Sequence, residues 1–337
     1  MSDVNRCWRL AARPQGMIKD SDFTFSQEPV PQIEDGEILV RNLYLSVDPT
    51  QRGWLERDTY MPAVPIGDVV RALGAGKVVA SKNPGYAVGD VVTALVGWQD
   101  YVVLRDKGAL RPTKVPASVP VPMALSAFGL TGLTAYFGML EIGQPKEGET
   151  VVVSGAAGAT GMMAGQIAKA KGCRVIGIAG GPEKCAWITG ELGFDAAIDY
   201  KSEKIPARLE ELCPDGINVF FDNVGGEILD AALTQIALRA RVVLCGSISG
   251  YNNMAETRGP KNYMALVTRR ARMEGFIVSD YAARFPEAIQ QLAAWFGAGK
   301  IKDRVDVLEG IENAPAALRR LFTGANVGKQ LVKIADA

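Results

Sequence analysis

Short runs of apolar residues separated by turn-forming residues fill the first third of the chain. Examples are EILVRNLYLSVDP, GAGKVVAS and YAVGDVVTALVGWQDYVVL, which are rich in valine and broken by Gly, Asp, Asn and Pro. Such runs are typical of β-strands, because branched side chains suit a pleated sheet and glycine and proline favour turns. Since no helical periodicity competes before about Met123, the pattern predicts a small, barrel-like all-β unit.

Farther along, apolar strand-like runs alternate with helix-like segments. Two of these helix-like segments span residues 182–192 and 227–238, and the second repeats apolar residues at helical spacing. The strand candidates are residues 151–154, 174–179, 196–199, 219–223, 241–245 and 272–278. Strands that alternate with helices at this rhythm predict a doubly wound parallel sheet of six strands, buried on both faces.

The end of the chain returns to a strand at 304–308, a helix at 314–322 and a strand at 329–334. This tail is too short to form a domain, so we expect it to rejoin the β-rich unit. The 337 residues suffice for two domains, because single cores stop growing near roughly 250 to 300 residues.

Composition excludes several classes of function. The 37 basic and 37 acidic residues balance, and no basic block occurs, so a nucleic-acid partner is not expected. Two uncharged stretches, 115–140 and 150–168, contain too many Pro, Gly, Ser and Thr residues to predict a membrane span. Histidine is absent, which removes the commonest metal ligand and general base, and we expect no metal site.

The five cysteines are scattered and odd in number, and none forms a CxxC pair. This pattern favours reduced thiols over a disulfide framework. The first residues, MSDVNRCWRL, carry charges before any apolar run and do not resemble a signal peptide. We therefore expect a cytoplasmic protein.

A glycine triplet follows the first strand of the alternating region, in VVVSGAAGATG at 151–161. Gly155 suits a tight turn, Gly158 the close approach of a phosphate, and Gly161 close packing of helix against strand. Ala159 and Thr160 open the helix, whose free N–H groups favour a pyrophosphate. A lone triplet also occurs in turns without a ligand, but the strand before it and the helix after it favour dinucleotide binding.

The type of dinucleotide depends on the end of the second strand. An NAD site places an acid there to bind the ribose hydroxyls, whereas this chain has Gly180 and Gly181, followed by Lys184. A lysine can neutralise a 2′-phosphate and glycine leaves room for it, so the segment favours NADP(H). Taken alone, Lys184 fits a solvated helix lysine better than a phosphate ligand.

Several longer motifs point to a known family. They are YLSVDP, GWQDY, LTAYFGMLEIGQPKEGE, KGCRVIGIAGGPEKC, DNVGGE, CGSISGYN, GFIV and GANVGK. With them the chain resembles the zinc-free medium-chain dehydrogenase/reductase superfamily, and within it the leukotriene B4 dehydrogenase and prostaglandin reductase family, especially the bacterial NADPH-dependent curcumin reductases. The resemblance spans nearly the entire chain.

The resemblance implies a GroES-like catalytic domain of residues 1–127 and 302–337, and a Rossmann NADP-binding domain of residues 128–301, in a homodimer. It implies that Lys184, Tyr200 and Asn326 hold the 2′-phosphate. It places Asn223 beside the cofactor. The residues implied around the nicotinamide half are Cys245, Gly246, Ser247, Ile248, Tyr251, Phe276, Ile277 and Val278.

The chemistry follows from the missing metal site. Without a Lewis acid, hydride must go to an acceptor that is already electrophilic, and a C=C bond conjugated to a carbonyl fits. The resemblance implies this reaction: NADPH reduces the double bond of an α,β-unsaturated ketone or aldehyde. A quinone reductase is an alternative, and an NADPH-binding protein with little turnover is an alternative of another class.

Tyr251 is the candidate catalytic donor to the enolate oxygen, or else an aromatic wall of the pocket. Where related chains have YxSxDPYMRG, this chain has YLSVDPTQRG, so its substrate pocket differs at Thr50 and Gln51. Further substrate-pocket candidates, each of which is also compatible with simple packing, are Tyr44, Arg52, Trp98, Tyr101 and Tyr136.

Overall fold

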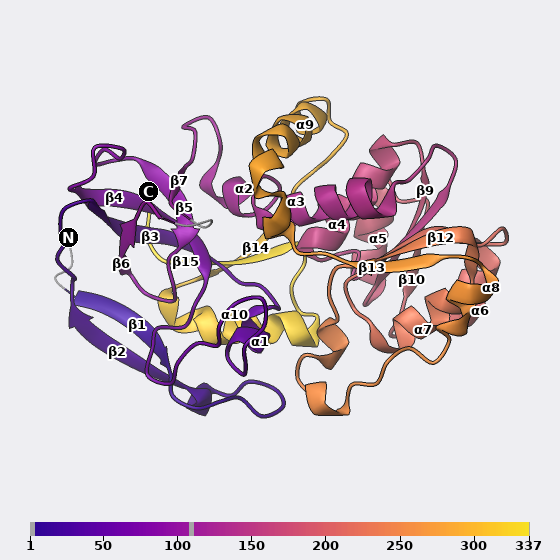
Figure 1. Cartoon of the computed structure of the whole chain (residues 1–337), viewed down its shortest axis with the longest axis horizontal. Helices are drawn as coiled ribbons and strands as arrows, with labels where there is room; N and C mark the ends of the chain where they lie inside the picture. Colours follow the sequence, from indigo (N-terminus) through magenta and orange to yellow (C-terminus); the bar gives the residue numbers. More distant parts are fainter. Residues whose placement is uncertain (1–3, 108–110, 337) are drawn as a thin grey trace. The chain divides into compact units, whose positions relative to one another are not determined.

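Antiparallel strands dominate the N-terminal part of the computed structural model, which describes residues 4–107 and 111–336 (Figure 1). β1 (Val4–Leu10) and β2 (Phe23–Pro29) form a two-stranded sheet. A second sheet has the order β14-β15-β3-β4-β5-β7, with β6 paired to β3. Its strands are β3 (Glu37–Ser46), β4 (Leu73–Ser81), β5 (Val91–Leu95), β6 (Tyr101–Arg105), β7 (Thr113–Lys114), β14 (Val305–Glu309) and β15 (Lys329–Lys333).

The C-terminal tail belongs to this second sheet. β15 pairs antiparallel with β3, and β14 pairs parallel with β15. Between these two strands lies α10 (Ala314–Thr323), whose Ala317 and Leu318 are buried in the same core cluster as Leu45 and Trp98. The apolar face of the tail therefore completes the core of the β-rich unit.

Two short helices interrupt the β-rich unit, α1 (Gln51–Trp54) and α2 (Val121–Leu125). α1 corrects the expectation that helical structure begins only near Met123. It is a single turn that follows Pro49, in which the N–H of Leu55 donates to the carbonyl of Gln51 at 3.0 Å. A helix of four residues is too short to show a periodic pattern.

A six-stranded parallel sheet forms the middle of the chain, in the order β10-β9-β8-β11-β12-β13. The number of strands and their parallel direction confirm the predicted doubly wound fold. Its strands are β8 (Thr150–Ser154), β9 (Arg174–Ala179), β10 (Ala196–Asp199), β11 (Ile217–Asp222), β12 (Ile236–Leu244) and β13 (Arg272–Gly275). Its helices are α3 (Leu130–Phe137), α4 (Ala159–Ala170), α5 (Pro182–Gly190), α6 (Ile205–Leu212), α7 (Gly226–Thr234), α8 (Met264–Thr268) and α9 (Phe285–Gly297).

The larger helices of this part contact one another in two groups. α3 packs against α4 and α9, while α7 packs against α6 and α8 (Figure 1). The strands between them are apolar on both sides: Val151, Val152 and Val153 of β8 are all fully buried. Burial on both faces explains why these strands are continuous apolar runs rather than alternating ones.

The boundary between α7 and β12 differs from the prediction. The expected helix at 227–238 ends at Thr234, and Ile236 already pairs with Ile217 of β11. The N–H of Ile217 donates to the carbonyl of Gln235 at 2.8 Å, which draws this segment into the sheet. Apolar residues at 236–238 satisfy a helical and a buried-strand pattern alike, so only the neighbouring strand separates the two.

The last strand of the sheet is also shorter than expected. β13 ends at Gly275 rather than at Val278, and a 3₁₀ segment begins at Val278 (Val278–Arg284). The chain leaves the sheet here because β12, the neighbour of β13, ends at Leu244, which pairs with Gly275. Phe276 and Ile277 therefore lie just beyond the carboxyl edge of the sheet.

Contacts divide the chain into two compact units, residues 1–125 with 305–337 and residues 126–304. The chain passes between the units after Leu125 and after Arg304, near the boundaries expected after residues 127 and 301. Across the described ranges 4–107 and 111–336, every helix is too short or too polar to span a membrane.

Candidate active site

The glycine loop closes tightly between β8 and α4. Gly155 has φ +59°, a left-handed conformation that glycine adopts without strain. A Cβ on Gly161 would lie 2.3 Å from the carbonyl oxygen of Gly155, so only glycine fits there. Gly158 is the N-cap of α4, with no side-chain hydrogen bond, and Ala159 begins the helix together with Thr160. This backbone geometry is the one that a pyrophosphate requires.

The loop after β9 has little free space beside its first glycine. A Cβ on Gly180 would lie 2.8 Å from the ring of Tyr200, so the tyrosine covers this glycine closely. Lys184 lies in the first turn of α5, half-buried. The structure thus brings Tyr200 onto Gly180 and sets Lys184 in the helix that follows.

An acid that the sequence reasoning missed also supports this loop. Asp199, at the end of β10, accepts hydrogen bonds from the N–H groups of Gly181 at 2.7 Å and Lys201 at 3.0 Å. These N–H donors lower the pKa of Asp199. The acid in IDYKSE could have been noticed in the sequence, but its neighbour across the sheet could not.

Three strand ends are joined by a buried hydrogen-bond network. The hydroxyl of Ser154 donates to Oδ1 of Asp222 at 2.7 Å and accepts from the N–H of Asn223 at 2.8 Å. The amide of Asn223 donates to the carbonyl of Ser154 at 2.7 Å. The carbonyl of Asp222 accepts from the N–H groups of Cys245 and Gly246. The predicted residue Asn223 is therefore held by Ser154, which Asp222 holds in turn, and neither of these two residues was predicted.

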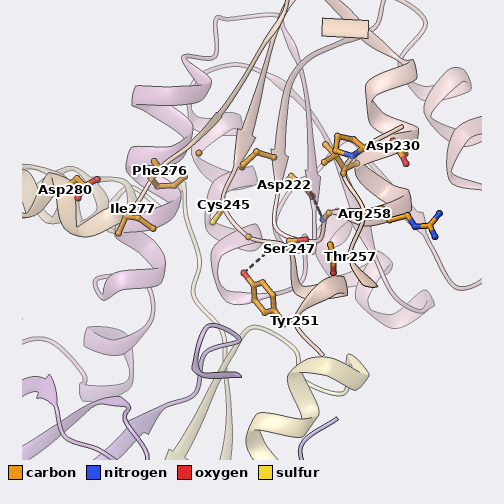
Figure 2. A pocket seen from close by; sticks show the side chains of 18 residues that line it. Asp222, Asp230, Cys245, Ser247, Tyr251, Thr257, Arg258, Phe276, Ile277 and Asp280 are labelled. Atoms are coloured by element: carbon orange, nitrogen blue, oxygen red, sulfur yellow. Dashed lines mark hydrogen bonds between the residues drawn. The ribbon is translucent and has the colours of Figure 1, made fainter. Parts of the chain in front are cut away.

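A cavity of about 650 Å³ lies at the carboxyl ends of β11, β12 and β13 (Figure 2). Its walls come from the loops after these strands and from the segment 257–260. Among the predicted cofactor residues, Cys245, Gly246, Ser247, Tyr251, Phe276 and Ile277 line it. Ile248 and Val278 each begin a 3₁₀ turn beside these residues and do not line the cavity.

Tyr251 is hydrogen-bonded to the loop that follows β12. Its phenol oxygen accepts a hydrogen bond from the N–H of Ser247 at 3.2 Å (Figure 2). A phenol that accepts one hydrogen bond can still donate another. In the same loop, burial raises the pKa of the Cys245 thiol to about 12, which disfavours the thiolate form.

The segment 257–260, which the sequence reasoning also missed, is anchored near both ends. The hydroxyl of Thr257 donates to the carbonyl of Asn253 at 3.2 Å. Oδ1 of Asp230, on α7, accepts from the N–H groups of Lys261 at 2.6 Å and Asn262 at 3.2 Å. Asp230, Thr257 and Arg258 surround this side of the cavity in Figure 2.

The substrate-pocket candidates are spread over both units. Tyr136 lies on α3 against Trp295, with ring centroids 6.2 Å apart, and burial raises the pKa of its phenol. Tyr44, on β3, is half-buried. Their role in binding substrate stays a prediction.

The other candidates of the β-rich unit are buried. Arg52 is 1% exposed, and its guanidinium donates to the carbonyls of Pro14 and Gly16. Trp98 and Tyr101 lie in the interior. Asn326, predicted to contact the cofactor, donates to the carbonyl of Gly328 at 3.0 Å. Their packing gives each a structural role, and a functional role stays a prediction.

The described residues, 4–107 and 111–336, contain no group of three or more Cys, Asp or Glu side chains placed to hold a metal ion. The lack of such a group among the described residues matters because one of the two matching families is named for zinc binding. Residues 159–294 match a family described as zinc-binding dehydrogenase, and residues 6–111 match the N-terminal domain of oxidoreductase.

Similar proteins are known over nearly the full length of the chain. The Bacillus subtilis protein YfmJ, whose assignment as an NADP-dependent oxidoreductase is provisional, is 47% identical over 97% of this chain and 97% of its own. NADPH-dependent curcumin reductase of Escherichia coli is 39% identical, covering 98% and 97%. The NADP(+)-dependent 2-alkenal reductase of Nicotiana tabacum is 38% identical, covering 95% and 94%.

Solved structures agree with these relatives. CurA from Vibrio vulnificus is 40% identical and superposes with a TM-score of 0.93 over 98% of this chain and 99% of CurA. Its complex with NADPH gives the same TM-score of 0.93. The chain therefore belongs to the medium-chain dehydrogenase/reductase superfamily of oxidoreductases, close to the curcumin reductases.

Proposed function

We propose that this protein reduces the C=C bond of α,β-unsaturated ketones or aldehydes with NADPH. The observation that carries the proposal is the cavity at the carboxyl ends of β11, β12 and β13, where Tyr251 lies beside the loop Cys245–Ser247. Ligands of doubly wound folds bind at this edge of the sheet. Curcumin and 2-alkenals, which the names of the relatives mention, are conjugated carbonyl compounds.

The residues present fit NADPH. Gly161 packs directly against the carbonyl of Gly155, a contact that any Cβ would block, and this tight turn leads into the N-terminus of α4, which has no side-chain cap. Gly155, Gly158, Ala159, Thr160 and Gly161 hold the pyrophosphate in this proposal. Gly180, Lys184 and Tyr200 hold the 2′-phosphate, with Asn326 as a further contact. The nicotinamide half lies with Asn223, Cys245, Gly246, Ser247, Ile248, Phe276, Ile277 and Val278.

Bound NADPH supplies a hydride to the β carbon of the acceptor. Tyr251 donates a hydrogen bond to the carbonyl oxygen of the acceptor, where negative charge develops as the enolate forms. The N–H of Ser247 supports this role, because it fixes the phenol oxygen from the other side. Either Tyr251 or solvent then supplies the proton to the α carbon.

Quinone reduction is the second enzymatic candidate, since quinones are conjugated carbonyls that accept hydride without a metal. A panel of acceptors separates the candidates: an aliphatic enone, a curcuminoid, an alkenal and a quinone, each followed by NADPH absorbance. We expect the enones and the alkenal to be reduced faster than the quinone. NADPH binding without consumption by any acceptor would instead favour a binding protein with little turnover.

A homodimer is part of the proposal. β13 is one of the two edge strands of the parallel sheet, and an unprotected edge strand favours pairing. Tyr263, Met264 and Val267, which lie beside or within α8, are each more than half exposed, as is Leu238 of β12. This apolar surface next to a sheet edge suits a second copy of the chain across a two-fold axis.

The five free thiols support a reducing, cytoplasmic location.

A further inference from the structure

A carboxyl group lies buried at the edge of the cavity. Asp222 is the last residue of β11, and its exposed fraction is 0%. It lines the cavity together with Cys245, Ser247 and Tyr251 (Figure 2). The carboxyl group joins strand ends through its hydrogen bonds, and its position at the cavity also lets its charge act on a bound ligand.

The hydrogen bonds to this carboxyl group come from neutral donors. Oδ1 accepts from the hydroxyl of Ser154 at 2.7 Å and from the N–H groups of Val224 and Gly225, both at 3.0 Å. Oδ2 accepts from the N–H of Gly225 at 3.1 Å. These three donors favour the ionised form, whereas burial, the larger effect, raises the pKa of Asp222.

The charge of Asp222 has no cationic partner. Within residues 4–107 and 111–336, the ion pairs of the structure do not include Asp222. Burial without a cation raises the pKa of Asp222, while the hydrogen bonds from Gly225, Ser154 and Val224 oppose this rise. A buried carboxylate of this kind is stabilised by a positive charge that enters the cavity, because charges interact more strongly where water is excluded.

We propose that Asp222 sets the preference of the site for the oxidised over the reduced cofactor. The inference rests on the proposed function, in which the nicotinamide half lies in this cavity. The oxidised nicotinamide ring carries a positive charge and the reduced ring is neutral. The Asp222 carboxylate therefore favours the binding of NADP⁺ over that of NADPH. The difference in affinity comes from the nicotinamide ring alone, since the remainder of the two cofactors is identical. As a consequence, NADP⁺ inhibits the enzyme as a product, and turnover follows the NADPH to NADP⁺ ratio.

The test measures dissociation constants of both cofactors by isothermal titration calorimetry on the full chain. In Asp222→Asn, which removes the charge and keeps the shape, we expect the preference for NADP⁺ over NADPH to fall about tenfold, a change of about 1.4 kcal/mol. Disturbance of the loops alone would weaken both cofactors equally and leave their ratio unchanged.

Two further variants make the test specific. Glu227→Gln removes an exposed negative charge on α7, five residues away in sequence, and the ratio should stay as in the wild type. Ser154→Ala removes one donor to the carboxylate, and we expect the ratio to fall about threefold, a smaller change in the same direction. Ser154→Ala also serves if Asp222→Asn does not fold.

Three results would overturn the inference. The first is a ratio within twofold of the wild type in both Asp222→Asn and Ser154→Ala. The second is an equal fall in Glu227→Gln, since any nearby negative charge would then suffice. The third is a wild type that binds neither cofactor, in which case the proposed function fails too. If the variants bind both cofactors and the ratio of the two dissociation constants is unchanged, only the role of Asp222 is refuted, and the proposed function stands.

Discussion

At the scale of single residues, the proposed site depends on glycines, which have no side chain, as much as on the side chains of other residues. Gly161 leaves the space that the Gly155 carbonyl occupies, and Gly180 leaves the space under the Tyr200 ring. Lys184 adds a positive charge in the helix after Gly180. Tyr251 adds a hydroxyl to the cavity at the other end of the proposed cofactor site.

Lys184→Ala is expected to weaken NADPH binding by about tenfold or more, because a charge-assisted hydrogen bond contributes about 1.5–3 kcal/mol. NADH binding should change by less than about twofold, since NADH lacks the 2′-phosphate. Titration of both cofactors by fluorescence measures this difference. Lys204→Ala, an exposed lysine that precedes α6, is the control. Equal losses for NADPH and NADH would show that Lys184 does not recognise the phosphate.

Tyr251→Phe is expected to lower kcat for an enone by more than tenfold, because loss of one donor to a developing oxyanion typically costs about 2.7–4 kcal/mol. The ring stays, so KM and NADPH affinity should change little. Tyr263→Phe is the matched control, because Tyr263 is 56% exposed and does not line the cavity. Steady-state kinetics with one enone measure the change in kcat. An unchanged kcat would mean that Tyr251 is only an aromatic wall of the pocket.

At the scale of elements, α4 packs on the sheet through small residues. A Cβ on Gly165 of α4 would lie 1.9 Å from the ring of Phe194, which is itself 3% exposed. The ring of Phe194, which lies between α5 and β10, can pack this closely on α4 only because Gly165 has no side chain. The position of α4 in turn sets the direction of the N–H groups at its start, so this packing supports the proposed phosphate site.

Gly165→Ala is expected to destabilise the protein by about 1–3 kcal/mol, the usual cost of an overpacked core. Gly190→Ala, at the end of α5, has nothing within 4 Å of the added carbon and should stabilise by up to about 1 kcal/mol through helix propensity. Urea unfolding of both variants measures the two free energies. Effects of the same sign would contradict the packing argument.

At the scale of the whole molecule, the proposed dimer makes a prediction about mass. Light scattering should give twice the 36.0 kDa of one chain. Val267→Glu, which places a charge on the exposed apolar surface of α8, should shift the protein toward the monomer. Val88→Glu changes an equally exposed valine of the β-rich unit and should leave the dimer intact. A dimer that Val267→Glu does not affect would place the interface elsewhere.

Predictions from the sequence succeeded where one local pattern determines the structure. The glycine triplet at Gly155, Gly158 and Gly161 lies between a strand and a helix as predicted, because Gly155 adopts a positive φ and Gly161 has no room for a Cβ. The end of α7 was wrong by four residues, since the segment 236–238 becomes a strand only beside Ile217. Asp199 and Asp222 were missed because the partners that tie them to the loops of the site, Gly181 and Ser154, lie 18 and 68 residues away in the sequence.

The sequence by itself determined the class of fold, the glycine loop and the preference for NADP(H), because periodicity, turn residues and the lack of an acid after β9 are local properties of the chain. Only the tertiary structure decided which side chains meet at the carboxyl edge of the sheet. Ser154 and Asp222 are 68 residues apart, and they become neighbours because β8 and β11 pair in the sheet. The strand order therefore buries the Asp222 carboxylate beside the cavity, an environment that no local pattern in the sequence reveals.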